Sequence, residues 1–156
     1  MNQNLAAGLL MCRISAKVLQ YFLVHPGGPY YINKDAGVWT LPKGIPEAEE
    51  ALIDTACREF FEETGIKPNP PFHEIGTVKQ KGGKVVHAWT FLGEWDPAMG
   101  ITCNTFMLEW PPKSGKQVAF PEMDKAKWMD YREAVAMINP AQIPFLDRAK
   151  EAFTTL

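Results

Sequence analysis

The sequence predicts an α+β or α/β sandwich domain in which short strands surround one central helix and a second helix closes the chain. Three observations predict this class: apolar runs of strand length near the amino terminus, an acidic amphipathic stretch in the middle, and helical spacing of apolar residues at the end. With 156 residues, 46% hydrophobic and 22% charged, the chain fits one soluble globular domain, residues 1–156.

The first strands are expected in two apolar runs, residues 7–15 and residues 17–26. The second run stops at a Pro-Gly-Gly sequence, which breaks regular structure. After a loop, residues 38–44 predict a short strand that ends at Pro42. These elements are expected to lie in one sheet.

The central helix is expected from about Glu47 to Thr64. Pro46 suits a helix start, and acidic side chains are stabilised in the first turn. Gly65 can take the left-handed conformation that caps a helix, and Pro68 prevents the helix from resuming.

A glycine pair, Gly82 and Gly83, predicts a β-hairpin in the second half of the chain. Two further strands are expected there, joined by a Pro- and Lys-containing loop, and a helix closes the chain. In order, the four strands and the helix are expected at residues 73–80, 84–95, 104–110, 125–131 and 140–153.

Apolar and acidic side chains of the central helix separate onto different sides at about 100° per residue. The apolar side is expected to dock on the core and contains Ile53, Cys57, Phe60 and Phe61. The other side is expected to project from a surface that the core leaves uncovered, and its carboxylates are Glu59, Glu62 and Glu63.

Three carboxylates this close repel one another unless protons or cations compensate. Mg²⁺ prefers carboxylate and water oxygens and leaves coordination positions for a substrate phosphate. Arg58 would hold one carboxylate by a bidentate pair, or else be a plain surface charge. The competing interpretation of the cluster is an exposed acidic helix face.

The acidic stretch also stands at a fixed distance from residues upstream. The pattern is Gly-x5-Glu-x7-Arg-Glu-U-x-Glu-Glu-x-Gly-U, with U apolar, and its fixed positions are Gly44, Glu50, Arg58, Glu59, Glu62, Glu63 and Gly65. Residues 44–66 thereby resemble the signature box of the Nudix hydrolase family. The resemblance implies an α/β/α sandwich with a mixed central sheet, the box helix and a carboxyl-terminal helix.

The resemblance also implies an activity and roles for the matched residues. The activity is hydrolysis of a nucleoside diphosphate linked to another moiety, with Mg²⁺ or Mn²⁺ bound by Glu59, Glu62 and Glu63. Glu59 also acts as a base in some members, and Arg58 belongs with the catalytic group. Lys43 is expected to offer its backbone carbonyl to a metal, while its ammonium group would meet a substrate phosphate or stay in solvent. The structural or supporting positions are Gly44, Glu50 and Gly65.

Glu122 is the favoured residue outside the box, as a general base or an additional metal ligand. The spacing from Glu122 to Trp128 resembles the Glu-His-x4-Trp region of the diadenosine tetraphosphate hydrolase branch, with Met123 where the histidine would stand. A plain loop carboxylate is the alternative interpretation. Asp124 and Glu109 are weaker candidates.

The lead into the box, WTLPKG, also resembles that branch, which makes Trp39 a candidate substrate-binding residue together with Lys43. The tyrosine that members of the branch commonly stack on the base is missing between residues 66 and 94. Trp89 or Phe72 would replace it, although such aromatic residues are more often core.

Other side chains carry weaker signals. Tyr30 and Tyr31 would line a base pocket or pin a turn. Lys113 and Lys116 would touch distal phosphates or stay solvated. No metal-ligand spacing relates the histidines, which are assigned no role: His25, His73 and His87.

The bulk properties limit the partners and the compartment. A net charge of −2 and a pI near 5.9 argue against bulk nucleic-acid binding. Three cysteines without a CxxC pair indicate neither a disulfide framework nor a zinc site, which favours a reducing cytoplasm. Neither a signal peptide nor a membrane anchor is expected. Monomer and homodimer both remain open.

The leading functional hypothesis is a magnesium-dependent pyrophosphohydrolase acting on a small-molecule nucleotide, with a dinucleoside polyphosphate or a nucleoside triphosphate as substrate. The alternatives are an ADP-ribose or nucleotide-sugar pyrophosphatase and a non-catalytic nucleotide-sensing domain. Loops outside the box set specificity, so the sequence leaves the substrate open.

Overall fold

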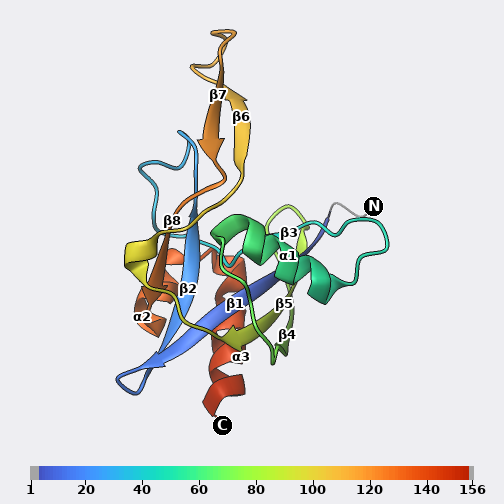
Figure 1. Ribbon diagram of the computed structural model, residues 1–156, viewed down its shortest axis with the longest axis vertical. Helices are drawn as coiled ribbons and strands as arrows, with labels where there is room; N and C mark the ends of the chain where they lie inside the picture. The colour runs from blue at the N-terminus through green and yellow to red at the C-terminus, as the bar shows by residue number, and fades with distance from the viewer. Residues whose placement is uncertain (1–3, 155–156) are drawn as a thin grey trace.

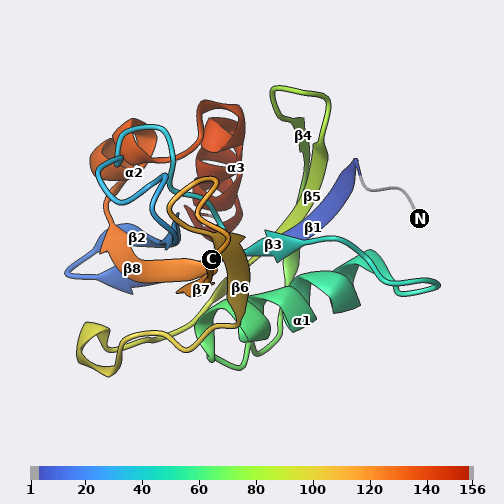
Figure 2. The same ribbon diagram turned by 90° about the horizontal axis from the view of Figure 1, so that it is seen from above.

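The computed structural model describes residues 4–154, which contain a mixed six-stranded sheet with helices on both faces (Figures 1 and 2). The strands of this sheet are β1 (Leu5–Ser15), β2 (Val18–Pro26), β3 (Lys43–Gly44), β4 (His73–Lys79), β5 (Val85–Leu92) and β8 (Met123–Met129). Their order is β4-β5-β1-β2-β8, and β3 pairs with β1. The β1–β5 pair is parallel and the other pairs are antiparallel.

Both faces of the central strands are buried, which explains why β1 and β2 are continuous apolar runs rather than alternating ones. Along β1, Leu9 and Met11 contribute to one core layer, whereas Leu10 and Cys12 contribute to the other. The alternation follows from the two-residue period of a strand. The prediction of two apolar strands near the amino terminus is confirmed.

Helices cover both core layers. The helix α1 (Leu52–Thr64) lies on one face of the sheet, and α2 (Tyr131–Met137) and α3 (Ile143–Thr154) lie on the other (Figure 2). Two short 3-10 helices, η1 (Pro97–Met99) and η2 (Pro140–Gln142), complete the set. The expected α/β/α sandwich is confirmed, including the closing helix. No helix within residues 4–154 is long and apolar enough to cross a membrane.

The hairpin of β4 and β5 is confirmed, whereas the strand expected at residues 38–44 is largely wrong. Only Lys43–Gly44 forms a strand, and Thr40 makes an isolated bridge to Val24. Pro42 has no N–H to give to a ladder. The regular pairing therefore begins after Pro42 rather than ending there.

The central helix begins at Leu52, not at Glu47 as predicted. Glu49 has a φ of 64°, which a right-handed helix does not allow, and the Glu50 N–H donates to the Glu47 carbonyl in a turn. The end is as predicted, since Gly65 caps the helix with a φ of 77°.

The loop expected between the last two strands contains a strand that the sequence prediction missed. The strands β6 (Thr105–Glu109) and β7 (Gln117–Pro121) pair in a two-stranded hairpin that projects from the body of the protein (Figure 1). Phe106 lies opposite Phe120 across this ladder. The helix α2 was also missed, and Asp130, expected in a strand, caps it by accepting a bond from the Glu133 N–H.

Phe60 and Phe61 differ in a way that corrects the predicted helix face. Phe60 is fully buried and packs on Phe22 and Phe91, whereas 53% of Phe61 is exposed. Adjacent helical residues lie about 100° apart, so one of the two must leave the core. Of these two phenylalanines, only Phe60 packs the helix against the sheet.

We expect Phe60→Ala to lower the free energy of unfolding by about 3–5 kcal/mol, because it leaves a cavity between the helix and the sheet. Phe61→Ala should change it by less than about 1 kcal/mol. Urea denaturation of both variants measures the difference, and equal losses would contradict the assigned helix face.

Candidate metal and phosphate site

The strand β3 brings the residues before the helix against the helix itself. It pairs with the first half of β1, at Ala7 and Gly8, while the second half of β1 pairs with β2. A Cβ atom on Gly44 would lie 2.0 Å from the Glu59 Cδ atom. Only glycine therefore allows the Glu59 carboxylate to lie over β3.

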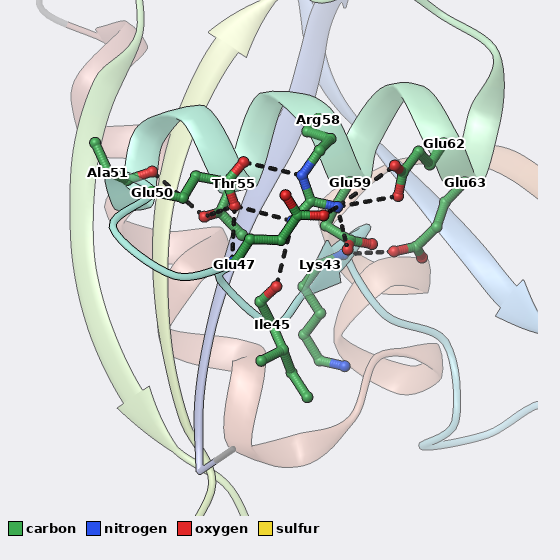
Figure 3. Close-up of polar contacts among 10 residues, drawn as sticks. All are labelled: Lys43, Ile45, Glu47, Glu50, Ala51, Thr55, Arg58, Glu59, Glu62 and Glu63. Carbon is green, nitrogen blue, oxygen red and sulfur yellow. Dashed lines mark hydrogen bonds and ion pairs between the residues drawn. The ribbon is translucent and has the colours of Figure 1, made fainter. Parts of the chain in front are cut away.

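Arg58 collects the carboxylates around it (Figure 3). Its Nε and Nη2 atoms donate to the two Glu50 oxygens, each at 2.9 Å, in a bidentate pair. Its Nη1 atom donates to Glu59 at 3.0 Å and to Glu62 at 3.2 Å. The predicted bidentate support is thus present on Glu50, and the plain surface charge is excluded.

The Arg58 pair sets the ionisation of Glu50. The hydrogen bond from Arg58 and a second bond from the Thr55 hydroxyl lower the pKa of Glu50 to about 2. The same bond to Glu50 raises the pKa of Arg58. Both groups are therefore charged at neutral pH, and the loop before the helix is tied to the helix by an ion pair.

Glu63 is buried, not projecting as expected, since only 2% of it is exposed. Its Oε2 atom accepts the Lys43 N–H at 3.2 Å, and its Oε1 atom has no hydrogen-bond partner among the described residues. Burial raises the pKa of Glu63 to about 9; the Lys43 charge opposes this, and Glu59 and Glu122 add to it. An ionised carboxylate at this position requires a cation.

Glu122 lies at the junction of β7 and β8, close enough to the helix for its charge to matter there. Glu122 is exposed, and partial desolvation, followed by the charge of Glu62, raises its pKa. Burial and the charge of Glu62 also raise the pKa of Glu59, and Glu122 contributes to that rise. Glu122 therefore lies near enough to the helix glutamates for its charge to raise the pKa values of Glu59 and Glu63.

Lys43 lies against the same carboxylates but turns its side chain away from them (Figure 3). Burial lowers the pKa of Lys43, and Glu63 opposes this shift. The side chain lines a cavity of about 250 Å³ with polar neighbours that include Tyr31, Asn139 and Gln142. A freely solvated loop lysine is therefore excluded.

The donor set fits a hard divalent cation. The Oε1 atom of Glu63 has no hydrogen-bond partner among the described residues, and burial together with neighbouring carboxylate charges raises the pKa values of Glu59, Glu63 and Glu122, so a cation would be stabilised here. Within residues 4–154, no three carboxylate, histidine or cysteine groups already converge on one point as metal ligands. Arg58 holds Glu50, Glu59 and Glu62 instead, so a cation would share two of these with it.

Several other candidates lie elsewhere. Trp39 is 4% exposed and belongs to the core layer on the α2 and α3 side, with its indole N–H donating to Asp35. Glu109 accepts the Lys113 N–H in the projecting hairpin. Asp124 bonds to His25. The structure does not bring these side chains onto the helix carboxylates.

The aromatic candidates also have packing partners. Trp89 and Phe72 pack on the core layer under α1, and His87 stacks on Trp89. Tyr30 packs edge-on against Trp110 of the projecting hairpin. A packing role therefore accounts for each of them, and Lys116 is exposed.

The model of the NUDIX domain family matches residues 5–149, almost the whole chain. The chain belongs to the Nudix hydrolase family. Gly44, Arg58 and the box glutamates accordingly occupy the Nudix box, and the loop-helix arrangement that places them is β3, the following turn and α1.

Curated relatives match over about a third of this chain. A human protein named nucleoside diphosphate-linked moiety X motif 6 is 45% identical over 49 residues, which is 31% of this chain and 15% of that protein. Phosphatase NudJ of Escherichia coli K12 is 36% identical over 52 residues, 31% of this chain and 34% of that protein. The matched segments thus span about a third or less of these relatives.

Solved structures match over nearly the full length. A Caenorhabditis elegans Ap4A hydrolase, in a binary complex, has a TM-score of 0.65 at 22% identity and covers 96% of this chain and 98% of its own. The NUDIX domain of Shewanella oneidensis NrtR, in complex with ADP ribose, has a TM-score of 0.64 at 20% identity, with 97% and 89% covered. At these identities the likeness shows the Nudix fold.

We expect Arg58→Lys to lower the free energy of unfolding by about 1–2 kcal/mol, because lysine cannot make the bidentate pair with Glu50 and reach Glu59 as well. Urea denaturation measures the loss. The exposed Arg132→Lys is the matched control and should leave stability unchanged. A loss no larger than that of the control would contradict the role of Arg58.

We expect the stability of the metal-free protein to fall between pH 5 and pH 9 because of Glu63. The unfolded chain releases this proton near the ordinary pKa of 4.5, and the folded chain keeps it until about 9. The contribution of Glu63 is therefore complete below pH 4.5 and is lost as the pH rises to 9.

Glu63→Gln removes this titration, so urea denaturation in a chelator should show a flatter pH dependence for the variant. Adding Mg²⁺ should reduce the fall in the wild type only. Identical slopes for the two proteins would contradict a buried, uncompensated Glu63.

Proposed function

We propose that the chain is a divalent-metal-dependent pyrophosphohydrolase that cleaves a diphosphate linkage in a nucleoside diphosphate linked to another moiety. The observation that carries the proposal is the buried Glu63 carboxylate, which has an orphaned oxygen and whose pKa is raised by burial and by the nearby charges of Glu59 and Glu122. A purely structural helix gains nothing from this arrangement, since burying an unpaired carboxylate costs stability.

The residues that would hold Mg²⁺ or Mn²⁺ are Glu59, Glu62, Glu63 and Glu122 together with the backbone carbonyl of Lys43. When bound, the cation supplies charge neutralisation for the diphosphate and an acidified water. Arg58 keeps Glu59 and Glu62 in place through its pair with Glu50. Glu122 is the proposed base, and Glu59 is the alternative.

The Lys43 ammonium group would bind a substrate phosphate. Lys43 lines a polar cavity together with Tyr31, Asn139 and Gln142, and no hydrogen-bond partner for its ammonium group is found among the described residues. Trp39 is not needed in this role, since its ring is buried and its N–H is bound to Asp35.

Dinucleoside polyphosphates and nucleoside triphosphates are the first substrates proposed, and the fold shared with an Ap4A hydrolase supports this order. ADP-ribose is the competing substrate, because a NrtR NUDIX domain with the same fold binds it. A non-catalytic nucleotide sensor is the third option. The intact carboxylate cluster favours the two enzymatic options.

The proposed setting is a reducing cytoplasm, with the protein acting as a monomer or homodimer on a small-molecule nucleotide. All three cysteines are free thiols. The net charge of −2 argues against nucleic acid as a substrate.

We expect Mg²⁺-dependent turnover of at least one substrate in a panel of dinucleoside polyphosphates, nucleoside triphosphates and ADP-ribose, read by product chromatography. Glu62→Gln should lower kcat/KM by at least roughly 10- to 100-fold, because a carboxylate of the metal site is lost. Glu94→Gln is the control, since this side chain is 80% exposed and remote from the cluster.

The outcome that sinks the proposal is binding of a nucleotide without turnover, or equal turnover by wild type and Glu62→Gln. Binding without turnover would favour the nucleotide sensor. The products identify the phosphorus attacked and so separate the substrate classes.

A further inference from the structure

His25 joins three segments of the chain inside the protein. It is fully buried at the end of β2, with Nδ1 2.7 Å from Asp124 Oδ1 on β8 and Nε2 2.5 Å from the Lys34 carbonyl oxygen. A carbonyl and an ionised carboxylate only accept hydrogen bonds. Both ring nitrogens therefore lie at hydrogen-bonding distance from an acceptor oxygen.

A β-bulge aims Asp124 at His25. In the β2–β8 ladder, His25 lies opposite Lys125 and Pro26 lies opposite Met123, so Asp124 is an extra residue on β8. A bulge turns a side chain away from the regular alternation and increases the local twist. The β-bulge thus allows Asp124 to make its hydrogen bond with the buried His25 ring.

The backbone of Glu122 is fixed two residues from this bond. The Gly27 N–H donates to the Glu122 carbonyl at 2.8 Å, and the Glu122 N–H donates to the Asn104 carbonyl at 3.0 Å. A Cβ atom on Gly27 would lie 1.9 Å from the Pro121 carbonyl oxygen, so glycine alone permits this approach. The backbone of Glu122 is therefore held by hydrogen bonds to Gly27, which follows β2, and to Asn104, which precedes β6.

The remaining groups that face His25 also belong to the loop and to β8. The Trp39 ring packs on the imidazole in an edge-to-face arrangement with 5.2 Å between the ring centroids, and the Trp39 indole N–H donates to Asp35. Asp35 lies 4.0 Å from His25 Nε2 and 3.8 Å from the Lys125 ammonium group. Two carboxylates thus lie within 4.0 Å of the ring nitrogens, and the Lys125 ammonium group pairs with one of them, Asp35.

We propose that His25 is a positioning residue that fixes Glu122 against the helix glutamates by clamping Asp124 of β8 to the Lys34 carbonyl of the loop. The inference rests on the proposed function, in which Glu122 is a base or a metal ligand. The Glu122 carboxylate accepts no hydrogen bond from the described residues. Its position depends on the backbone on either side.

A double-substitution cycle between Asp124→Ala and Glu122→Gln tests the clamp, with kcat and KM measured on the substrate found in the panel. In the wild-type background, Asp124→Ala should lower kcat at least tenfold with little change in KM. In the Glu122→Gln background, Asp124→Ala should cause no further loss of kcat, because the carboxylate that Asp124 helps to position is already absent. If the kcat losses of Asp124→Ala and Glu122→Gln multiply in the double variant, the inference is overturned.

Amide hydrogen exchange provides a readout that does not depend on turnover. Asp124→Ala should speed exchange of the Gly27 and Glu122 amides at least tenfold, whereas the β1 amides stay unchanged. Unchanged exchange at Gly27 and Glu122 would overturn the clamp. His87→Gln, which breaks an exposed histidine–carboxylate pair with Glu74, is the matched control and should affect neither amide.

If Asp124→Ala does not fold, Asp124→Leu replaces it in both experiments, because it keeps a similar side-chain size and cannot accept the hydrogen bond from His25. Absence of turnover in the wild type would remove the proposed function while the exchange experiment still decides whether His25 and Asp124 hold Glu122. The two failures are therefore distinguishable.

Discussion

The bidentate bond between Arg58 and Glu50 is the interaction on which the site depends. It joins the turn before the helix to the helix, and the same guanidinium holds Glu59 and Glu62. The single positive charge of Arg58 thereby orients three carboxylates, those of Glu50, Glu59 and Glu62, which would otherwise repel one another. Arg58 makes no hydrogen bond to Glu63. The one buried side-chain oxygen without a hydrogen-bond partner among the described residues is therefore Oε1 of Glu63.

The burial of Glu63 follows from the spacing of the helix. Ala56, Phe60 and Glu63 are separated by four and three residues, so they lie on one buried stripe of α1. The fold thus puts a carboxylate where packing alone would place an apolar residue. Such a conflict between local rule and residue type is typical of functional sites. The packing of Phe60 and the hydrogen bond from the Lys43 N–H are what hold this carboxylate in place.

The box and the sandwich were predictable from the sequence because their signals are local: apolar periodicity, a helix cap and fixed spacing. The helix start was misjudged because Glu50 binds Arg58 and Thr55 in a turn, which composition does not reveal. Phe61 and Glu63 were assigned to the wrong sides because the apolar stripe was centred between Phe60 and Phe61. The pair of His25 and Asp124 spans 99 residues, and no local pattern announces it.

In the proposed site, different parts of the fold hold the α1 carboxylates and Glu122, and this difference has a consequence for substrate specificity. A helix presents its carboxylates from one side only, so a group on the other side of a bound phosphate must come from another segment. Glu122 comes from the junction of β7 and β8, which is fixed by β2 and by the residue before β6 rather than by α1. The projecting hairpin of β6 and β7 ends directly at that junction. Changes in the hairpin can therefore alter what lies opposite the helix while the Arg58 network, the Gly44 contact and the buried Glu63 stay as they are.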